Sequence, residues 1–162
     1  MSWDMNKYWP VPLAFAALAF PMTAFANTES TDTTPPEEPS AELIVDAAAV
    51  ALDDFLWLKR PVIVFADTPA DARFVQQMQL LTRELDELEL RDVVVITDTD
   101  PEAESALRTK LRPRGFMLAL VGKDGQVKLR KPLPWSVREL SRTIDKMPMR
   151  QQEIRDRRGS GL

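Results

Sequence analysis

Hydroxyl, carboxylate and guanidinium side chains gather at three places where this sequence could support chemistry. The set comprises Asp67, Thr68, Asp71, Asp98, Asp100, Arg112 and Arg114. Thr68 precedes Pro69 at a predicted helix start, where free backbone N–H groups can hold an anion or a substrate. The same pattern also suits a plain helix cap, and the nearby Asp71 would repel an anion. We therefore favour the capping role for Thr68.

Two residue types that carry much of protein chemistry are missing from the chain. It contains no cysteine and no histidine. Disulfide exchange, thiol peroxidase chemistry and a lipoprotein anchor are thereby excluded, and the commonest general base is lost. Zinc, copper and non-haem iron sites are disfavoured because only carboxylates remain as ligands. We expect no metal and no cofactor, and we assign no catalytic residue.

A run of alternating acids follows the second predicted strand. Its members are Asp98, Asp100, Glu102 and Glu104. The spacing begins like that of a calcium-binding loop. The glycine that such a loop has at its sixth position and the acid at its twelfth are missing. Carboxylates at a helix start are also stabilised by the helix dipole. We favour this interpretation over calcium binding.

Two continuous apolar runs predict strands that are buried on both faces, Val62–Ala66 and Asp92–Thr97. Between them, Thr68 as N-cap, Pro69 and Asp71 open a helix. The apolar stripe of that helix comprises Phe74, Met78, Leu81, Leu85 and Leu88. A strand–helix–strand unit of this length implies parallel pairing with a right-handed crossover.

The next segment predicts a helix followed by a β-hairpin. Asp100-Pro101 starts the helix, which ends near Leu111. Phe116–Val121 forms a third strand. The Asp-Gly pair in Lys123–Gln126 predicts a tight turn into an antiparallel fourth strand, Val127–Arg130.

A closing helix follows the hairpin. Ser136 and Glu139 form its capping box. Its apolar stripe comprises Val137, Leu140, Ile144 and Met147. Pro148 interrupts it, and Met149–Arg158 is a charged segment that is compatible with a further helix.

The predicted fold class is α/β, a thioredoxin-like three-layer sandwich with the order β-α-β-α-β-β-α and a mixed four-stranded sheet. An Ala-rich stretch before it, Ala41–Leu58, predicts a short helix. In this topology the ends of the first two strands and the start of the third share one sheet edge. Such edges bind ligands in open α/β sheets, so the seven polar residues named at the outset form a candidate ligand rim. A rim of mutually neutralised surface charges is the simpler alternative.

The amino-terminal segment is typical of a secretory signal peptide, residues 1–26. Lys7 supplies positive charge, Val11–Phe20 is the apolar core, and small residues flank the predicted cleavage between Ala26 and Asn27. An uncleaved membrane anchor is the alternative, but a spanning helix needs about 20 apolar residues. Residues 27–41 then predict a disordered linker, 42–158 the domain, and 159–162 a disordered tail.

Charge is distributed unevenly along the chain. The formal net charge is −4, with acids concentrated after the predicted signal peptide and bases near the carboxyl terminus. An acidic domain argues against a nucleic-acid partner. Membrane contact is expected only through an uncleaved leader or the basic tail.

A set of short motifs carries a family resemblance. They are Leu52, Trp57, Arg60-Pro61, Arg91-Asp92, Gly115-Phe116, Gly122-Lys123-Asp124-Gly125, Lys128-Leu129-Arg130, Ile144-Asp145, Met147-Pro148-Met149-Arg150 and Glu153. Over roughly Leu52–Arg158 the chain resembles the bacterial family known as domain of unknown function 4174. The GKDG and IDxMPMR segments are its most specific parts.

The resemblance implies a thioredoxin-like fold, distantly similar to peroxiredoxins but lacking redox cysteines, and an exported setting. It implies no established activity. In a thioredoxin fold the reactive cysteine lies where the first strand meets its helix, which here is Ala66–Asp71. Gly115 stands where that fold usually has a cis-proline, which argues against peptide binding through that loop.

Together these observations predict a periplasmic or secreted, non-catalytic thioredoxin-like domain that binds a protein or a small ligand. Two alternatives remain open. One is a divergent, thiol-independent enzyme that uses the Thr68 edge with Arg112 or Arg114. The other is an envelope-attached structural protein.

Overall fold

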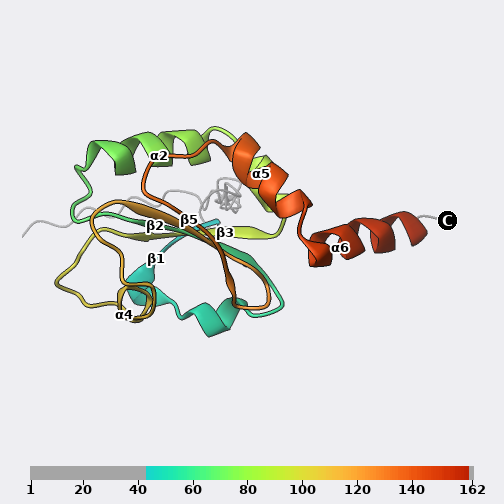
Figure 1. Ribbon diagram of the computed structural model, residues 1–162, viewed down its shortest axis with the longest axis horizontal. Coiled ribbons are helices and arrows are strands. Elements are labelled where there is room, and N and C mark those ends of the chain that lie inside the picture. Colours follow the sequence, from blue (N-terminus) through green and yellow to red (C-terminus); the bar gives the residue numbers. More distant parts are fainter. Residues whose placement is uncertain (1–42, 161–162) are drawn as a thin grey trace, which may run out of the picture. The chain divides into compact units, whose positions relative to one another are not determined.

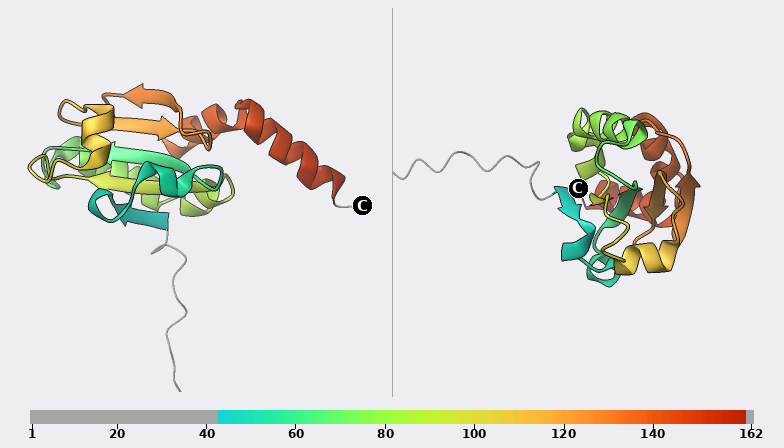
Figure 2. Two further views of the ribbon diagram at one scale, coloured as in Figure 1. Left: turned by 90° about the horizontal axis from the view of Figure 1, so that it is seen from below. Right: turned by 90° about the vertical axis from the view of Figure 1, so that its left-hand side faces the viewer.

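Runs of valine, isoleucine and leucine build the centre of a five-stranded sheet. The computed structural model describes residues 43–160, so the predicted signal peptide, its cleavage site and residues 27–41 lie outside the described residues. The strands are β1 (Ile44–Asp46), β2 (Arg60–Phe65), β3 (Val93–Asp98), β4 (Met117–Val121) and β5 (Val127–Lys131). They lie in the order β1-β3-β2-β4-β5 (Figure 2, left). β1 and β2 run parallel to β3, while β4 runs antiparallel to both β2 and β5.

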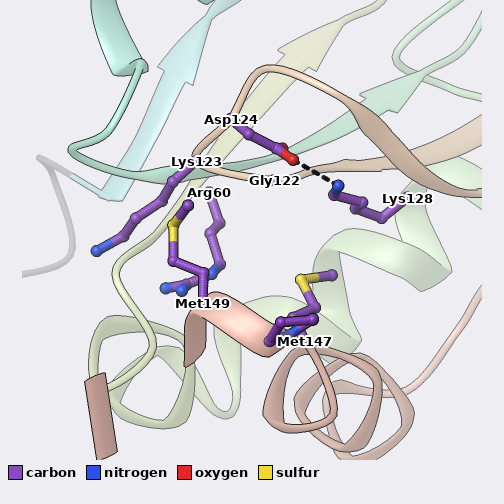
Figure 3. Close-up of a pocket in the computed structure, with 8 residues that line it drawn as sticks. Arg60, Gly122, Lys123, Asp124, Lys128, Met147 and Met149 are labelled. Carbon is purple, nitrogen blue, oxygen red and sulfur yellow. Dashed lines mark hydrogen bonds and ion pairs between the residues drawn. The ribbon is translucent and has the colours of Figure 1, made fainter. Parts of the chain in front are cut away.

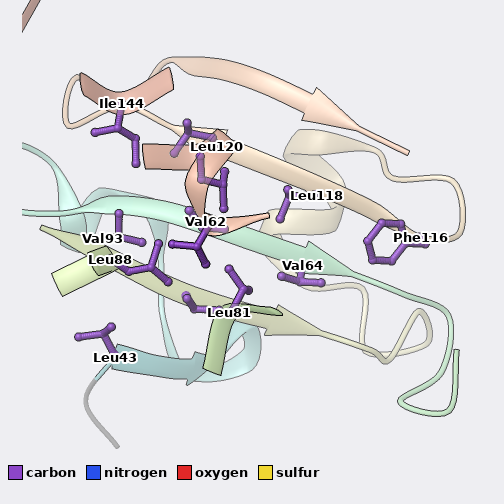
Figure 4. Close-up of a cluster of buried hydrophobic side chains, with 13 residues drawn as sticks. Leu43, Val62, Val64, Leu81, Leu88, Val93, Phe116, Leu118, Leu120 and Ile144 are labelled. Atoms are coloured by element: carbon purple, nitrogen blue, oxygen red, sulfur yellow. The ribbon is translucent and has the colours of Figure 1, made fainter. Parts of the chain in front are cut away.

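Side chains alternate between the two faces of this sheet, as the pleat requires. Val62 and Val64 of β2 enter one apolar cluster, together with Leu118 and Leu120 of β4 (Figure 4). Neighbouring residues in the same strands, such as Ile63, enter a second cluster on the other face. Both faces are covered, which explains why the strands read as continuous apolar runs.

The helices divide between these faces (Figures 1 and 2). Packed on the first cluster are α2 (Ala72–Thr82), α3 (Leu85–Glu89) and α5 (Val137–Asp145). On the second lie α4 (Ala106–Leu111) and two short 3₁₀ turns, η1 (Ala47–Ala49) and η2 (Leu52–Phe55). The last helix, α6 (Pro148–Gly159), buries only Arg150.

Most of the predicted architecture is confirmed. The parallel pair, the antiparallel hairpin and the closing helix are all present. The Ser136–Glu139 capping box forms on α5. Pro148 separates α5 from α6, which it begins at the first helical position.

Two helix starts were predicted wrongly. The cap of α2 is Asp71 rather than Thr68, because Asp71 accepts the Arg73 N–H at 2.8 Å. The cap of α4 is Ser105 rather than Asp100, and it accepts the Arg108 N–H at 3.0 Å. In both cases a second capping residue, closer to the apolar stripe, displaces the first.

Two further differences concern the predicted elements themselves. The long helix after β2 is divided into α2 and α3 at Arg83 and Glu84, although Leu81 and Leu88 stay in one core. Residues 44–55, where a short helix was expected, form β1 and the two 3₁₀ turns, so the sheet has five strands rather than the predicted four. β1 is short, and only its pairing with β3 stabilises it as a strand.

No helix within residues 43–160 is long and apolar enough to cross a membrane.

Candidate functional site

Asp98, the last residue of β3, is buried, with 4% of its surface exposed. Its carboxylate accepts hydrogen bonds from the Ser105 hydroxyl at 2.5 Å and from Arg108 Nε at 2.6 Å. Arg108 also donates to the carbonyl oxygens of Ala66 and Asp98 where β2 and β3 end. Its guanidinium lies over the Phe65 ring, 5.7 Å from the centroid. Asp98 therefore has a structural role, because its bond to Arg108 links the ends of β2 and β3. The sequence analysis did not identify Arg108 as its partner.

The Thr68 segment is a turn that leads into α2. Thr68 Oγ1 accepts the Ala70 N–H at 3.3 Å. Asp71 is engaged by Arg73, whose side-chain and backbone hydrogen bonds lower the pKa of that carboxyl. Asp67 is exposed and lies 3.8 Å from Arg108 Nη1. These local bonds account for the polar side chains without a ligand.

Asp100 organises the loop after β3. One of its oxygens accepts the N–H groups of Glu102 at 2.9 Å and Ala103 at 3.3 Å. A hollow of about 160 Å³ beside it also involves Asp46 and Asp98. Within residues 43–160 no group of three or more acids is arranged to hold a metal ion.

Arg112 and Arg114 lie in a different place, a hollow that we call the cationic hollow. Arg112 ends α4 in the left-handed conformation (φ 49°), and its N–H donates to Arg108 O at 2.8 Å. The hollow has a volume of about 280 Å³. Its lining is Arg112, Arg114, Phe116, Met117, Arg130, Lys131 and Pro132.

None of the four cations of this hollow forms an ion pair with any acid in the described part of the chain. Arg130 donates to Leu111 O at 2.9 Å, and Lys131 Nζ lies 4.6 Å from the centroid of the Trp135 ring. These contacts hold two of the four side chains in place and leave their charge without a counter-ion among the residues that the structure describes. The hollow is thus a place where an anion would be electrostatically favoured.

Sequence reasoning named only half of this site. Arg130 and Lys131 come from β5, which was predicted as the partner of the third strand but not as part of the rim. No local signal identifies both, because neighbouring residues of a strand point to opposite faces and the pattern of Val127–Lys131 does not assign them to one site. The structure thus divides the seven predicted residues: Asp98 and Asp100 line one hollow, and Arg112 and Arg114 line another.

At the opposite end of the sheet lies a dense ion-pair cluster, formed by Arg60, Asp92, Lys123, Arg150 and Glu153. Glu153 Oε1 lies 2.7 Å from Arg60 Nη2 and 3.0 Å from Lys123 Nζ. Lys123 also reaches Asp92 at 2.8 Å, and Arg150 reaches Glu153 at 3.3 Å. Arg60, at the start of β2, is 1% exposed. The cluster fastens α6 to the ends of β2, β3 and β4.

Beside this cluster is a cavity of about 240 Å³ (Figure 3). Met147 and Met149 line it from the junction of α5 and α6, and Gly122 and Lys128 from the hairpin. Lys128 is paired with Asp124 at 2.6 Å. The GKDG and IDxMPMR segments, the most specific parts of the resemblance, therefore meet at one cavity wall.

The pairing in this cluster controls the titration of Glu153. Burial alone would raise the pKa of this carboxyl, but hydrogen bonds from Arg60 and Lys123 outweigh burial and lower it to about 2. Glu153 is therefore charged at every physiological pH.

The fold defines a thioredoxin-like class. The structure is similar to thioredoxin peroxidase I of Plasmodium yoelii, with 17% identity and a TM-score of 0.52 over 64% of this chain and 80% of that chain. It is also similar to the reduced 2-Cys peroxiredoxin of Plasmodium vivax, with 14% identity and a TM-score of 0.53 over 64% and 85%. At these identities the likeness concerns the fold alone.

The chain belongs to the family described as domain of unknown function (DUF4174), whose model matches residues 51–153. No curated protein matches it. The family resemblance expected from the sequence motifs is confirmed, and so is the lack of a cysteine in a fold that it shares with peroxiredoxins.

Proposed function

We propose that this protein is an exported, non-catalytic thioredoxin-like binding domain whose ligand is an anion held in the cationic hollow. The observation that carries the proposal is a set of four cations around one cavity that have no acidic partner within residues 43–160, namely Arg112, Arg114, Arg130 and Lys131. Carboxylate and phosphate groups are the anions that guanidinium groups bind best, through paired N–H donors.

The surroundings of the hollow support a ligand with some apolar character. Phe116 is buried and Met117 half-buried, and both line the same cavity. A cavity with apolar walls and a few convergent polar groups is the usual form of a small-molecule site. The four cations would supply affinity, and the walls would select among anions.

The proposal needs no thiol. The chain has no cysteine, so it cannot perform the chemistry for which the two Plasmodium peroxiredoxins are named. In the turn where a reactive cysteine would stand, the side chains of Thr68 and Asp71 accept hydrogen bonds from the backbone N–H groups of Ala70 and Arg73. The binding of an anion in the cationic hollow does not involve this turn.

Calorimetric titration with tripolyphosphate and with citrate tests the anion site. We expect binding that weakens as salt rises, and that weakens by about tenfold or more in an Arg112→Ala/Arg114→Ala variant. Lys146→Ala, which removes an exposed cation at the far end of α5, is the matched control and should bind like the parent. Equal binding by both variants would refute the assignment of the site.

Export rests on the sequence of residues 1–26 and is tested separately. The protein expressed with its own leader in a Gram-negative host should be recovered from the periplasm. Its amino-terminal residue, read by Edman degradation, should be Asn27. Recovery with Met1 intact would overturn the cleavage proposal and favour envelope attachment.

A further inference from the structure

β5 is an outer strand of the sheet. It pairs with β4 on one side, and no strand of the described chain lies on its other side. Its exposed residues are Val127, Lys128 and Arg130. An edge of this kind presents backbone N–H and C=O groups that can pair with an added strand.

This open edge runs directly into the cationic hollow. Arg130 and Lys131 belong to β5 and line the hollow, and Pro132 follows them. Arg112 and Arg114 reach the same hollow from the segment before β4. A chain laid along β5 would therefore place its side chains beside cations that have no carboxylate partner among the described residues.

The basic side chains of β5 determine which kind of strand can pair with this edge. A second copy of β5 would bring Lys128, Arg130 and Lys131 against their own counterparts. Like charges on neighbouring strands are destabilising, and basic edge residues are a common protection against self-pairing. An acidic strand would instead meet opposite charge at Arg130 and Lys131, which have no carboxylate partner among the described residues, whereas Lys128 is already paired with Asp124.

From this edge we infer that the physiological ligand of the cationic hollow is an acidic, extended peptide segment that pairs as a further strand with β5. Main-chain hydrogen bonds to β5 would supply part of the affinity. The carboxylates of the peptide, bound in the cationic hollow, would supply the selectivity for acidic sequences. This inference rests on the proposed anion site, because it names the class of molecule that brings the anion.

The test uses a blocked peptide of about eight residues with alternating glutamate and threonine, and the full-length protein. Two further peptides carry N-methyl groups on the amides of all glutamates or of all threonines. Because successive amides of a strand point to opposite edges, each set blocks one edge and leaves every charge in place. We expect at least one methylated set to weaken binding by about tenfold, the loss of two or more backbone hydrogen bonds.

A neutral peptide with glutamine in place of glutamate is the charge control and should not bind measurably. Amide signals of residues 127–131 should shift in the NMR spectrum with the acidic peptide. If neither methylated set weakens binding by more than about threefold, the strand addition is wrong. If tripolyphosphate binds but the acidic peptide does not, this inference fails while the anion site stands; if neither binds, the anion site itself fails.

Discussion

The two ends of the sheet use the same residue types for different purposes. Where β2 begins, Arg60 and Lys123 share the carboxylate of Glu153, and Arg150 approaches the same group from α6. Where β5 ends, Arg130 and Lys131 face a hollow that no acid of the described chain neutralises. One end is a closed network, and the other is an open set of charges.

Burial explains the difference. Arg60 is 1% exposed, and a charge removed from water must be paired and hydrogen-bonded to be tolerated. The exposed Arg112 and Arg114 remain hydrated and need no partner. Cations whose charge is already balanced hold the structure together, whereas exposed cations without a partner remain available for a ligand.

The comparison predicts its largest effect at Arg60. Arg60→Ala leaves Glu153 without its 2.7 Å partner and Arg91 O without its 2.8 Å donor, in a partly buried setting. We expect the free energy of unfolding to fall by about 3 kcal/mol, measured by urea denaturation. Arg114→Ala is the matched control at the other end and should change it by less than about 0.5 kcal/mol. Equal losses in the two variants would remove the distinction between the ends.

A second prediction concerns acid stability. The pKa of Glu153 is about 2 in the folded state, below its ordinary value of 4.5. The stability it contributes is complete above pH 4.5 and is lost as the pH falls from there through 2. Glu153→Gln should remove this part of the pH dependence and lower stability at neutral pH. A variant whose acid unfolding curve has the parent's shape would show that the pair contributes little.

A third prediction reverses one charge at the open end. Arg114→Glu should weaken tripolyphosphate binding by about tenfold in calorimetry, because it both removes a donor and introduces repulsion. Thermal stability should stay near that of the parent, since the side chain is exposed and has no carboxylate partner among residues 43–160. A stability loss with unchanged affinity would reverse the roles assigned to the two ends.

The smallest effect separates the two candidate caps of α2. Asp71→Ala should lower the free energy of unfolding more than Thr68→Ala does, because Asp71 accepts the Arg73 N–H at 2.8 Å. Thr68→Ala should cost less than about 0.5 kcal/mol, since its bond to the Ala70 N–H is long, at 3.3 Å. Chemical denaturation of both variants measures the difference. The reverse order would restore Thr68 as the cap.

Much of the fold could be predicted because its signals are local. The apolar run at Val62–Ala66, the Asp124-Gly125 turn and the Ser136 capping box each lie within a few residues, and β2, the hairpin and α5 follow from them. β1 could not be predicted, because three residues in an Ala-rich stretch become a strand only by pairing with β3. The α4 start was missed because Asp98, outside the helix, holds the capping Ser105 hydroxyl.

The candidate site was predictable in part for the same reason. Arg112 and Arg114 stand in one short segment, so the sequence already suggested a cluster. Their companions Arg130 and Lys131 follow the hairpin, and no pattern specified which side of the strand would face them. Arg60 and Glu153 are 93 residues apart, and only the folded chain brings them to 2.7 Å.

The sequence by itself determined the central strands, the hairpin, the closing helix, the thioredoxin-like topology and the absence of thiol chemistry, because periodicity, turn residues and composition act over short distances. The tertiary structure decided which charges are paired across the chain, such as Arg60 with Glu153. Ion pairing depends on distances between residues far apart in the chain and on their burial, and neither can be read from spacing. For this reason the predicted rim is divided in the structure. Asp98 binds Ser105 and Arg108, whereas Arg112 and Arg114 line the cationic hollow beside β5.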